Sequence, residues 1–130
     1  MRHRLFVYGT LQLPERVHEI IGRTLSGPPA LLPDYRCGLV ARADFPGIVP
    51  SATESTPGCL LSGLTQRELS LLDDYEGELY RRVNVTVKVD GKPVRAWVYV
   101  IAAWAWERVT GERWSIGHYR CRIGKVRLTY

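Results

Sequence analysis

A valine-rich segment on each side of Asp90-Gly91 constrains the fold of this chain more than any other feature. Residues 83–89 alternate valine with polar or charged residues, which is the period of a half-buried strand. Asp-Gly is a strong signal for a two-residue type I′ turn. Such a turn pairs Val87 with Val94, Val85 with Ala96, and Val83 with Val98. All of these side chains then lie on one face of a hairpin, and Trp97 and Tyr99 lie on the other, facing a cavity or a second layer.

The segment before this hairpin carries the signature of a capped helix. Thr65 and Glu68 stand at the spacing of a capping box. Leu64 and Leu69 stand at the positions of a hydrophobic staple, which packs the residue before the cap against the helix. We therefore predict a helix that begins at Thr65 and continues to about Asp74.

Glu76 differs from the other acidic residues at the end of this helix. It lies seven residues after Leu69, so it falls on the same buried stripe if the helical geometry continues. Desolvation among Leu72, Tyr75 and Tyr80 would raise its pKa toward the range in which general acid/base catalysis is efficient. The residues alone do not decide between a catalytic role for Glu76 and a purely structural one. The neighbouring acids are interpreted as solvated surface groups with loose arginine partners; these residues are Asp73, Asp74 and Glu78, with Arg81 and Arg82.

The N-terminal segment is predicted to form a buried strand followed by a tight turn. Residues 5–8 are apolar or aromatic, and Gly9 stops the run. A glycine at this point either reverses the chain or lets backbone N–H groups approach a ligand closely. No glycine-rich phosphate-binding motif completes the turn, so both interpretations stay open.

The remaining elements are predicted from periodicity and from turn-forming residues. Pro14 suits the first turn of a helix of about three turns, whose apolar residues continue to Leu25. Alternation around Cys37 predicts a half-buried strand, and residues 58–64 predict another. The prolines and the glycine within residues 44–50 predict a loop. Alternating basic residues at 120–128 predict a final edge strand.

Composition narrows the class of protein. A chain of 130 residues with 45% hydrophobic content is expected to form one domain over residues 1–130, without a membrane span or an export signal. Its three cysteines and three histidines lack the spacing of a disulfide framework or a metal site, which favours a reducing, cytoplasmic setting and no metal or other cofactor. The net charge of +5 fits anionic substrates, nucleic acid or solubility. Because no nucleic-acid motif accompanies the basic residues, no nucleic-acid partner is expected.

Three short motifs occur together in this chain. They are Phe6-Val7-Tyr8-Gly9-Thr10-Leu11, then Phe45-Pro46-Gly47-Ile48-Val49, then Leu72-Asp73-Asp74-Tyr75-Glu76-Gly77 followed by Tyr80-Arg81-Arg82. In order and spacing they resemble the γ-glutamylcyclotransferase-like superfamily, which includes the γ-glutamylamine cyclotransferases and the AIG2-like proteins. The resemblance extends from about residue 5 to residue 99. It implies an α+β fold, a small mixed β-barrel flanked by short helices, with a substrate cavity at one end.

The resemblance also implies an activity and roles for individual residues. Glu76 matches the glutamate that serves as the family's catalytic acid/base. A turn matches the one that holds the glutamyl group through backbone N–H groups, and two tyrosines match residues that line the pocket. These residues are Tyr8, Gly9, Thr10 and Leu11 in the turn, and Tyr80 and Tyr99. The implied reaction turns the γ-glutamyl group of an amine or peptide into 5-oxoproline and releases a free amine.

The chain departs from the family pattern near its C-terminal end. Family members often carry an acidic Gly-Asp-Trp-type segment there, whereas this chain has Gly117-His118-Tyr119-Arg120. The resemblance therefore does not predict the residues of the far wall of the pocket, where substrate identity is set. A non-catalytic module that binds a carboxylate metabolite on the same fold is the alternative to an enzyme.

Overall fold

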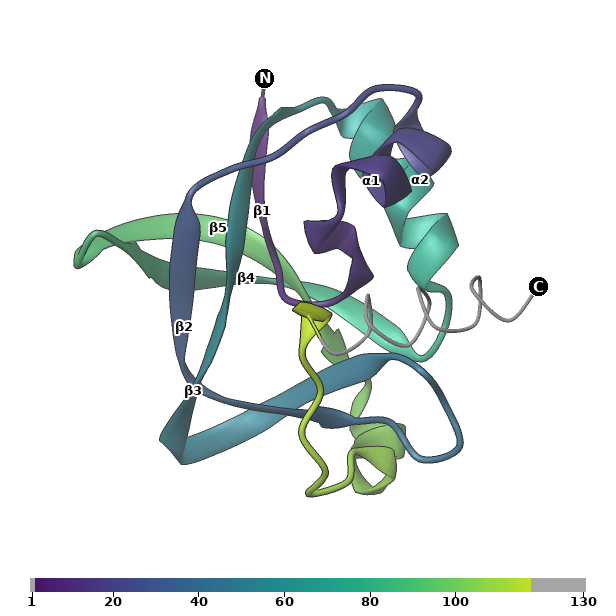
Figure 1. Cartoon of the computed structure of the whole chain (residues 1–130), viewed down its shortest axis with the longest axis vertical. Coiled ribbons are helices and arrows are strands. Elements are labelled where there is room, and N and C mark those ends of the chain that lie inside the picture. Colours follow the sequence, from purple (N-terminus) through teal and green to yellow (C-terminus); the bar gives the residue numbers. More distant parts are fainter. Residues whose placement is uncertain (1, 118–130) are drawn as a thin grey trace.

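The structure, a computed structural model, describes residues 2–117 (Figure 1). In chain order its elements are β1 (His3–Val7), η1 (Thr10–Gln12), α1 (Pro14–Ile21), β2 (Pro29–Leu39), β3 (Pro46–Leu64), α2 (Gln66–Glu76), β4 (Tyr80–Val89), β5 (Lys92–Ile101) and η2 (Ala103–Arg108).

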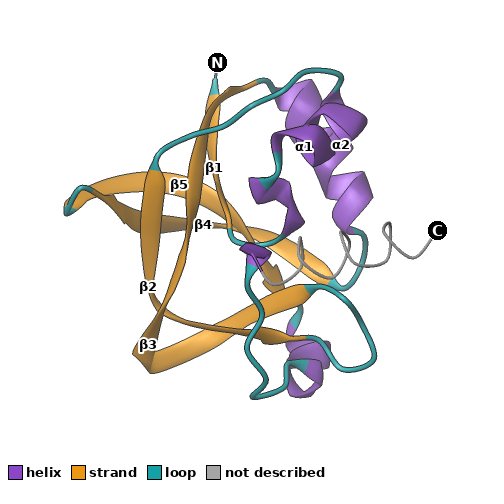
Figure 2. Ribbon diagram, in the orientation of Figure 1, coloured by secondary structure: helices purple, strands orange, loops and turns teal. Residues whose placement is uncertain are grey.

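The strands close into a small barrel in the order β1-β3-β2-β4-β5. β1 closes the ring by pairing in parallel with β5 through Leu5 and Trp97, and the other neighbouring strands are antiparallel. Helices α1 and α2 lie side by side against one side of this barrel (Figures 1 and 2). The predicted fold class is confirmed: an α+β protein built from a small mixed barrel flanked by short helices.

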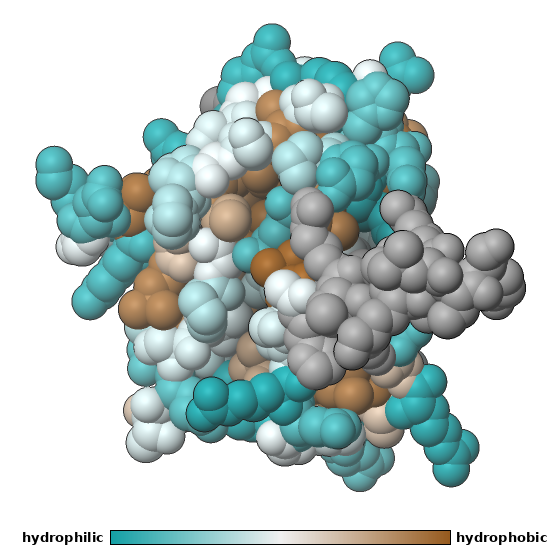
Figure 3. Space-filling view, in the orientation of Figure 1, coloured by the Kyte–Doolittle hydropathy of each residue, from teal (hydrophilic) through white to brown (hydrophobic). Residues whose placement is uncertain are grey.

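β1 shows how the barrel is packed on both of its faces. Phe6 and Tyr8 belong to the cluster that fills the barrel interior, whereas Leu5 and Val7 belong to the cluster between the barrel and the helices. A strand covered on both faces reads as a continuous apolar run, and this explains the sequence of β1. The visible surface outside these clusters is mostly polar, with apolar residues in small patches (Figure 3).

The hairpin of β4 and β5 has the predicted register. Val87 pairs with Val94, Val85 with Ala96 and Val83 with Val98. Asp90 and Gly91 have φ angles of 52° and 76°, and a type I′ turn requires positive φ at both of these positions. Trp97 and Tyr99 face the cluster that contains the leucines of α2. The second layer that receives them is therefore the helical one.

Helix α2 begins as the sequence predicts. The backbone N–H of Glu68 donates to the Thr65 hydroxyl oxygen at 3.1 Å, and the Thr65 N–H donates to the Glu68 carboxylate at 2.9 Å, so the capping box is complete. Leu69 is fully buried beneath the first turns. The helix extends through Glu76, two residues beyond the predicted end, and Gly77 caps it.

The predicted loop over residues 44–50 is wrong, because β3 begins at Pro46 and continues for 19 residues. A proline is tolerated at the first position of a strand or at a bulge. Pro46 occupies the first position, and Pro50 pairs with Tyr35 next to an irregularity in β2. The strand predicted at residues 58–64 is the C-terminal part of this long strand.

Helix α1 is shorter than predicted. It ends at Ile21 because Gly22 adopts the left-handed conformation, with φ of 84°. Leu25 nevertheless packs against the cluster between the barrel and the helices. The predicted edge strand at residues 120–128 lies outside the described residues. Within residues 2–117, no helix combines the length and the apolar content needed to cross a membrane.

Candidate active site

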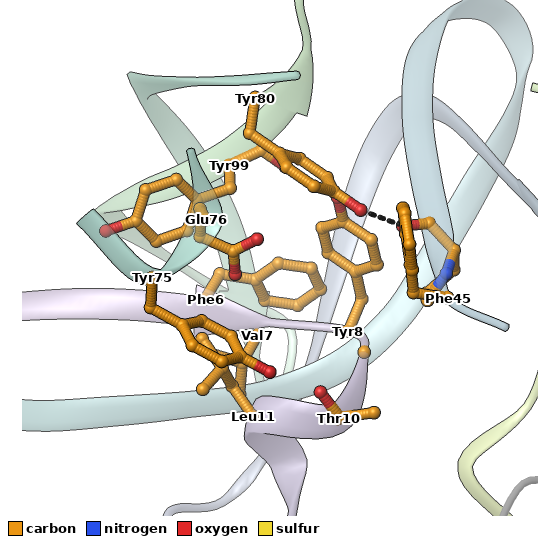
Figure 4. Close-up of a pocket in the computed structure, with 12 residues that line it drawn as sticks. Phe6, Val7, Tyr8, Thr10, Leu11, Phe45, Tyr75, Glu76, Tyr80 and Tyr99 are labelled. Atoms are coloured by element: carbon orange, nitrogen blue, oxygen red, sulfur yellow. Dashed lines mark hydrogen bonds between the residues drawn. The ribbon is translucent and has the colours of Figure 1, made fainter. Parts of the chain in front are cut away.

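A cavity of about 260 Å³ lies where β1 leads into η1 and where α2 ends (Figure 4). Its walls come from β1, η1, the start of β3, and single side chains of β4 and β5. The lining residues are Phe6, Val7, Tyr8, Gly9, Thr10, Leu11, Phe45, Pro46, Tyr75, Glu76, Tyr80 and Tyr99. The structure thus brings all the predicted site residues together around one cavity, and their roles stay predictions.

Among the lining residues within the described part of the chain, only Glu76 has a carboxylate. It is the last residue of α2, and its side chain lies among the aromatic side chains of the cavity (Figure 4). Burial, and after it the negative charge of Asp73, raise the pKa of this carboxyl to about 7. A carboxyl with such a pKa exchanges its proton readily at neutral pH.

Three of the four tyrosines that line the cavity donate hydrogen bonds from their hydroxyl groups to protein acceptors. Tyr8 donates to the carbonyl oxygen of Tyr99 at 2.6 Å, and Tyr80 donates to the carbonyl oxygen of Pro46 at 2.6 Å. The Tyr99 hydroxyl donates to an oxygen of Asp73 at 2.7 Å. Burial raises the pKa of all three hydroxyl groups well above its usual value. They are therefore neutral, and each has only oxygen lone pairs left to offer.

The turn after β1 is a short helical segment, η1, held by Gln12. The Gln12 side-chain amide donates to the Tyr8 carbonyl oxygen at 2.9 Å, and its backbone N–H donates to the Gly9 carbonyl oxygen at 3.1 Å. A Cβ atom on Gly9 would lie 3.2 Å from Cγ of Pro46, so the close approach of the turn to β3 favours glycine. The first N–H groups of such a segment have no partner within it.

Five lining residues were not among the predicted site residues: Phe6, Val7, Phe45, Pro46 and Tyr75. Phe45 packs against Tyr80 with 6.2 Å between ring centres. Tyr75 is 43% exposed at the cavity rim, where its hydroxyl oxygen accepts a hydrogen bond from Arg16 at 2.9 Å. All five lie within the three short motifs, which were the signal that could have located them.

Asp73 is more than a solvated acid with a loose partner, which corrects that interpretation. Both of its carboxylate oxygens accept hydrogen bonds from Arg82, at 2.8 and 3.1 Å. The same carboxylate accepts a hydrogen bond from the Tyr99 hydroxyl. Asp73 is therefore a fixed link between α2 and the β4–β5 hairpin. In residues 2–117, no group of three histidine, cysteine or acidic side chains is arranged to hold a metal ion.

The barrel, the aromatic cavity and the half-buried carboxyl define a class of protein that comparison with known families makes explicit. The family model described as gamma-glutamyl cyclotransferase, AIG2-like, matches residues 5–120. The chain belongs to this family.

Two proteins of Arabidopsis thaliana show how close the relatives are. AIG2-like protein D is 34% identical over 85 residues, which cover 65% of this chain and 56% of that protein. Protein AIG2 C is 32% identical over 120 residues, which cover 91% of this chain and 72% of that protein. The match to AIG2-like protein D thus spans little more than half the length of that relative.

Solved structures extend the similarity to the whole fold. A solution structure from Arabidopsis thaliana superposes with a TM-score of 0.80 at 28% identity, covering 99% of this chain and 79% of that one. The crystal structure of a mouse AIG2-like protein superposes with a TM-score of 0.67 at 23% identity, covering 82% of each chain. At that identity the mouse structure supports the fold alone.

Proposed function

We propose that this protein is a γ-glutamylcyclotransferase-type enzyme that cyclises the γ-glutamyl group of an amine or peptide to 5-oxoproline and releases the free amine. The observation that carries the proposal is the Glu76 carboxyl, whose pKa is raised to about 7 at the wall of an aromatic cavity. A group that titrates near neutral pH both accepts and returns a proton, as this reaction requires.

The reaction needs no nucleophile from the protein, because the substrate carries its own. Glu76 takes a proton from the neutral α-amino group of the substrate as the nitrogen of this group attacks the γ-carbonyl carbon. A bond from this nitrogen to carbon forms and closes a five-membered ring. The bond to the leaving nitrogen then breaks as Glu76 returns the proton to it. Such proton transfer contributes about 10² to 10⁴ in rate.

The hydrogen-bonding inventory of the cavity supports this assignment of roles. Because Tyr8 and Tyr80 donate their hydroxyl hydrogens to protein carbonyl oxygens, their hydroxyl oxygens can only accept further hydrogen bonds. An acceptor-rich wall beside Glu76 suits the amino end of a substrate. The substrate carboxylate and the developing oxyanion require donors, and we assign these to the backbone N–H groups of Gly9, Thr10 and Leu11, at the start of η1.

The size of the cavity limits what it encloses. A cavity of about 260 Å³ is just below the usual range of small-molecule sites, about 300 to 1,000 Å³. We therefore expect it to hold the glutamyl group in a folded conformation, with the leaving amine toward the rim near Tyr75. Holding the substrate folded supplies the orientation that ring closure needs. A reducing, cytoplasmic setting is part of the proposal, in keeping with the free thiols of Cys37 and Cys59.

Replacing Glu76 tests the proposal directly. Glu76→Gln keeps the shape of the side chain and removes its acid/base chemistry, so release of 5-oxoproline should fall by at least about 10². Substrate binding, followed by thermal shift, should persist. Asp74→Asn is the matched control, because it removes an exposed acid of the same helix and should leave turnover unchanged. Full activity in the Gln variant would remove Glu76 from the mechanism.

A panel of γ-glutamyl amines, γ-glutamyl dipeptides and glutathione identifies the substrate. Release of 5-oxoproline from any of them supports the enzyme. Thermal stabilisation by panel members without release supports the alternative, a non-catalytic module that binds carboxylate metabolites on the same fold.

A further inference from the structure

Asp73 lies one helical turn before Glu76 on α2 and contacts two strands of the barrel. Its carboxylate accepts the hydroxyl proton of Tyr99, a residue of β5, at 2.7 Å. Arg82, a residue of β4, donates to both of its oxygens at 2.8 and 3.1 Å. A bidentate pair of this kind restricts both the position and the orientation of the carboxylate.

Arg82 is itself held in place from a second side. Its guanidinium lies over the ring of Trp97, 4.3 Å from the ring centre, and the Arg82 side chain is 18% exposed. Cation–π contact and the bidentate ion pair together leave this side chain little freedom. The chain of contacts therefore runs from Trp97 through Arg82 to Asp73, and from Asp73 to Tyr99.

Tyr99 is the other end of this arrangement. It is 5% exposed and lines the same cavity as Glu76. Its hydroxyl points away from the cavity centre, on the far side of Glu76 from Tyr8, so the ring lies beside the Glu76 side chain (Figure 4). The hydrogen bond to Asp73 is what ties the hydroxyl there.

We propose that Asp73 is a positioning residue for Glu76. Arg82 holds the Asp73 carboxylate in place, and this carboxylate in turn fixes Tyr99 beside the Glu76 carboxyl. Asp73 also places a fixed negative charge one helical turn from Glu76. The inference rests on the proposed function, since it concerns how Glu76 is prepared for acid/base chemistry. It goes beyond the cavity wall, because Asp73 and Arg82 do not line the cavity.

The charges around Glu76 favour this assignment. The titratable groups of the barrel that interact with the charge of Glu76 are the hydroxyls of Tyr8, Tyr80 and Tyr99, and burial raises the pKa of each. They are neutral in the working pH range. The like charge of Asp73 follows burial as the second cause of the raised pKa of Glu76. Residues three apart on a helix have Cβ atoms about 5–6 Å apart, close enough for a like charge to act.

A titration of Glu76 in the unliganded chain tests the proposal without any substrate. The glutamate carboxyl carbons are labelled with ¹³C, the Glu76 signal is assigned by its loss in Glu76→Gln, and its midpoint is followed by NMR. Asp73→Asn should lower the midpoint by up to about one pH unit, the size expected for a like charge near the protein surface. Asp74→Asn, which removes an exposed charge from the same helix, should leave the midpoint in place. Equal midpoints in wild type and Asp73→Asn overturn the proposal.

Arg82→Gln tests the same arrangement with the opposite sign. It keeps Asp73 but removes the cation that compensates its charge, so the Glu76 midpoint should rise. No change, or a fall, contradicts the proposal. This variant also keeps the test decisive if Asp73→Asn does not fold.

Activity adds a second readout once a substrate is known. The acid limb of the kcat/KM profile of Asp73→Asn should move to lower pH by the same amount as the NMR midpoint. A chain that shows the midpoint shift but no turnover of any γ-glutamyl compound refutes the proposed function and leaves the role of Asp73 standing. A merely structural link between α2 and the hairpin would lower stability and leave both the midpoint and the acid limb unmoved.

Discussion

Glu76 should make the folded protein less stable at alkaline pH than it would be with a neutral side chain at this position. The pKa of an ordinary glutamate is 4.5, whereas that of Glu76 in the folded protein is about 7. The folded state therefore binds this proton more tightly than the unfolded state does. The stabilisation from protonation is fully present below about pH 4.5 and is lost as the pH rises through about 7.

The magnitude follows from these two pKa values. At about 1.36 kcal/mol for each tenfold change in proton affinity, the gap between them corresponds to roughly 3 kcal/mol. Solvent reaches the cavity side of the carboxyl and screens its charge, so we expect about 2 to 3 kcal/mol. Glu76→Gln removes the buried charge and should raise the free energy of unfolding by this amount at pH 8, with little difference from wild type at pH 4.

Urea unfolding of wild type and Glu76→Gln at a series of pH values measures this difference. Other titrating groups are common to both proteins, so their contributions largely cancel. Asp74→Asn provides the control for removing a charge from the same helix, and its stability relative to wild type should not increase between pH 4 and pH 8. Two results would refute the reasoning: Glu76→Gln is no more stable than wild type at pH 8, or it is more stable by the same amount at pH 4. In either case ionisation of Glu76 would not destabilise the folded protein.

Two further predictions concern how the site is held. Thr65→Ala removes the hydroxyl that accepts a hydrogen bond from the Glu68 N–H at 3.1 Å and should lower the free energy of unfolding by about 1 kcal/mol. Thr65→Ser keeps a hydroxyl and should retain most of this stability. Equal loss in both variants would exclude the cap as the cause. Tyr80→Phe removes the hydrogen bond to the Pro46 carbonyl at 2.6 Å and should cost about 1 kcal/mol in the same urea assay, and an unchanged midpoint would mean that water replaces the hydroxyl.

Short-range sequence patterns predicted the elements that are determined by residues close together in the chain. The capping box placed the start of α2, and Asp90-Gly91 set the register of β4 and β5 because a two-residue turn allows only one pairing. The buried stripe of α2 brought Glu76 into the set of site residues. These features depend on residues within a few positions of each other, so tertiary contacts had little to override.

Predictions failed where long-range pairing decides the structure. The Pro46 to Pro50 segment reads as a loop, and only its pairing with the neighbouring strand β2 makes it a strand. The role of Asp73 was also out of reach of periodicity, because its partners Arg82 and Tyr99 lie on two different strands. Among acids at a helix end, sequence alone does not tell which one meets a guanidinium and a tyrosine hydroxyl after the barrel has closed.

The two ends of α2 divide stability and chemistry between them. The first turn carries the capping box, and the leucines Leu69 and Leu72 anchor the helix in a fully buried cluster. The last turn carries Asp73 and Glu76, at the end where the helix dipole disfavours acids. The anchoring contacts lie in the earlier turns. The helix therefore stays formed even though its last turn carries a carboxyl whose ionised form is destabilising. Loss of the cap should therefore lower stability while leaving the titration of Glu76 in place, and changes at Asp73 should move that titration more than they change stability.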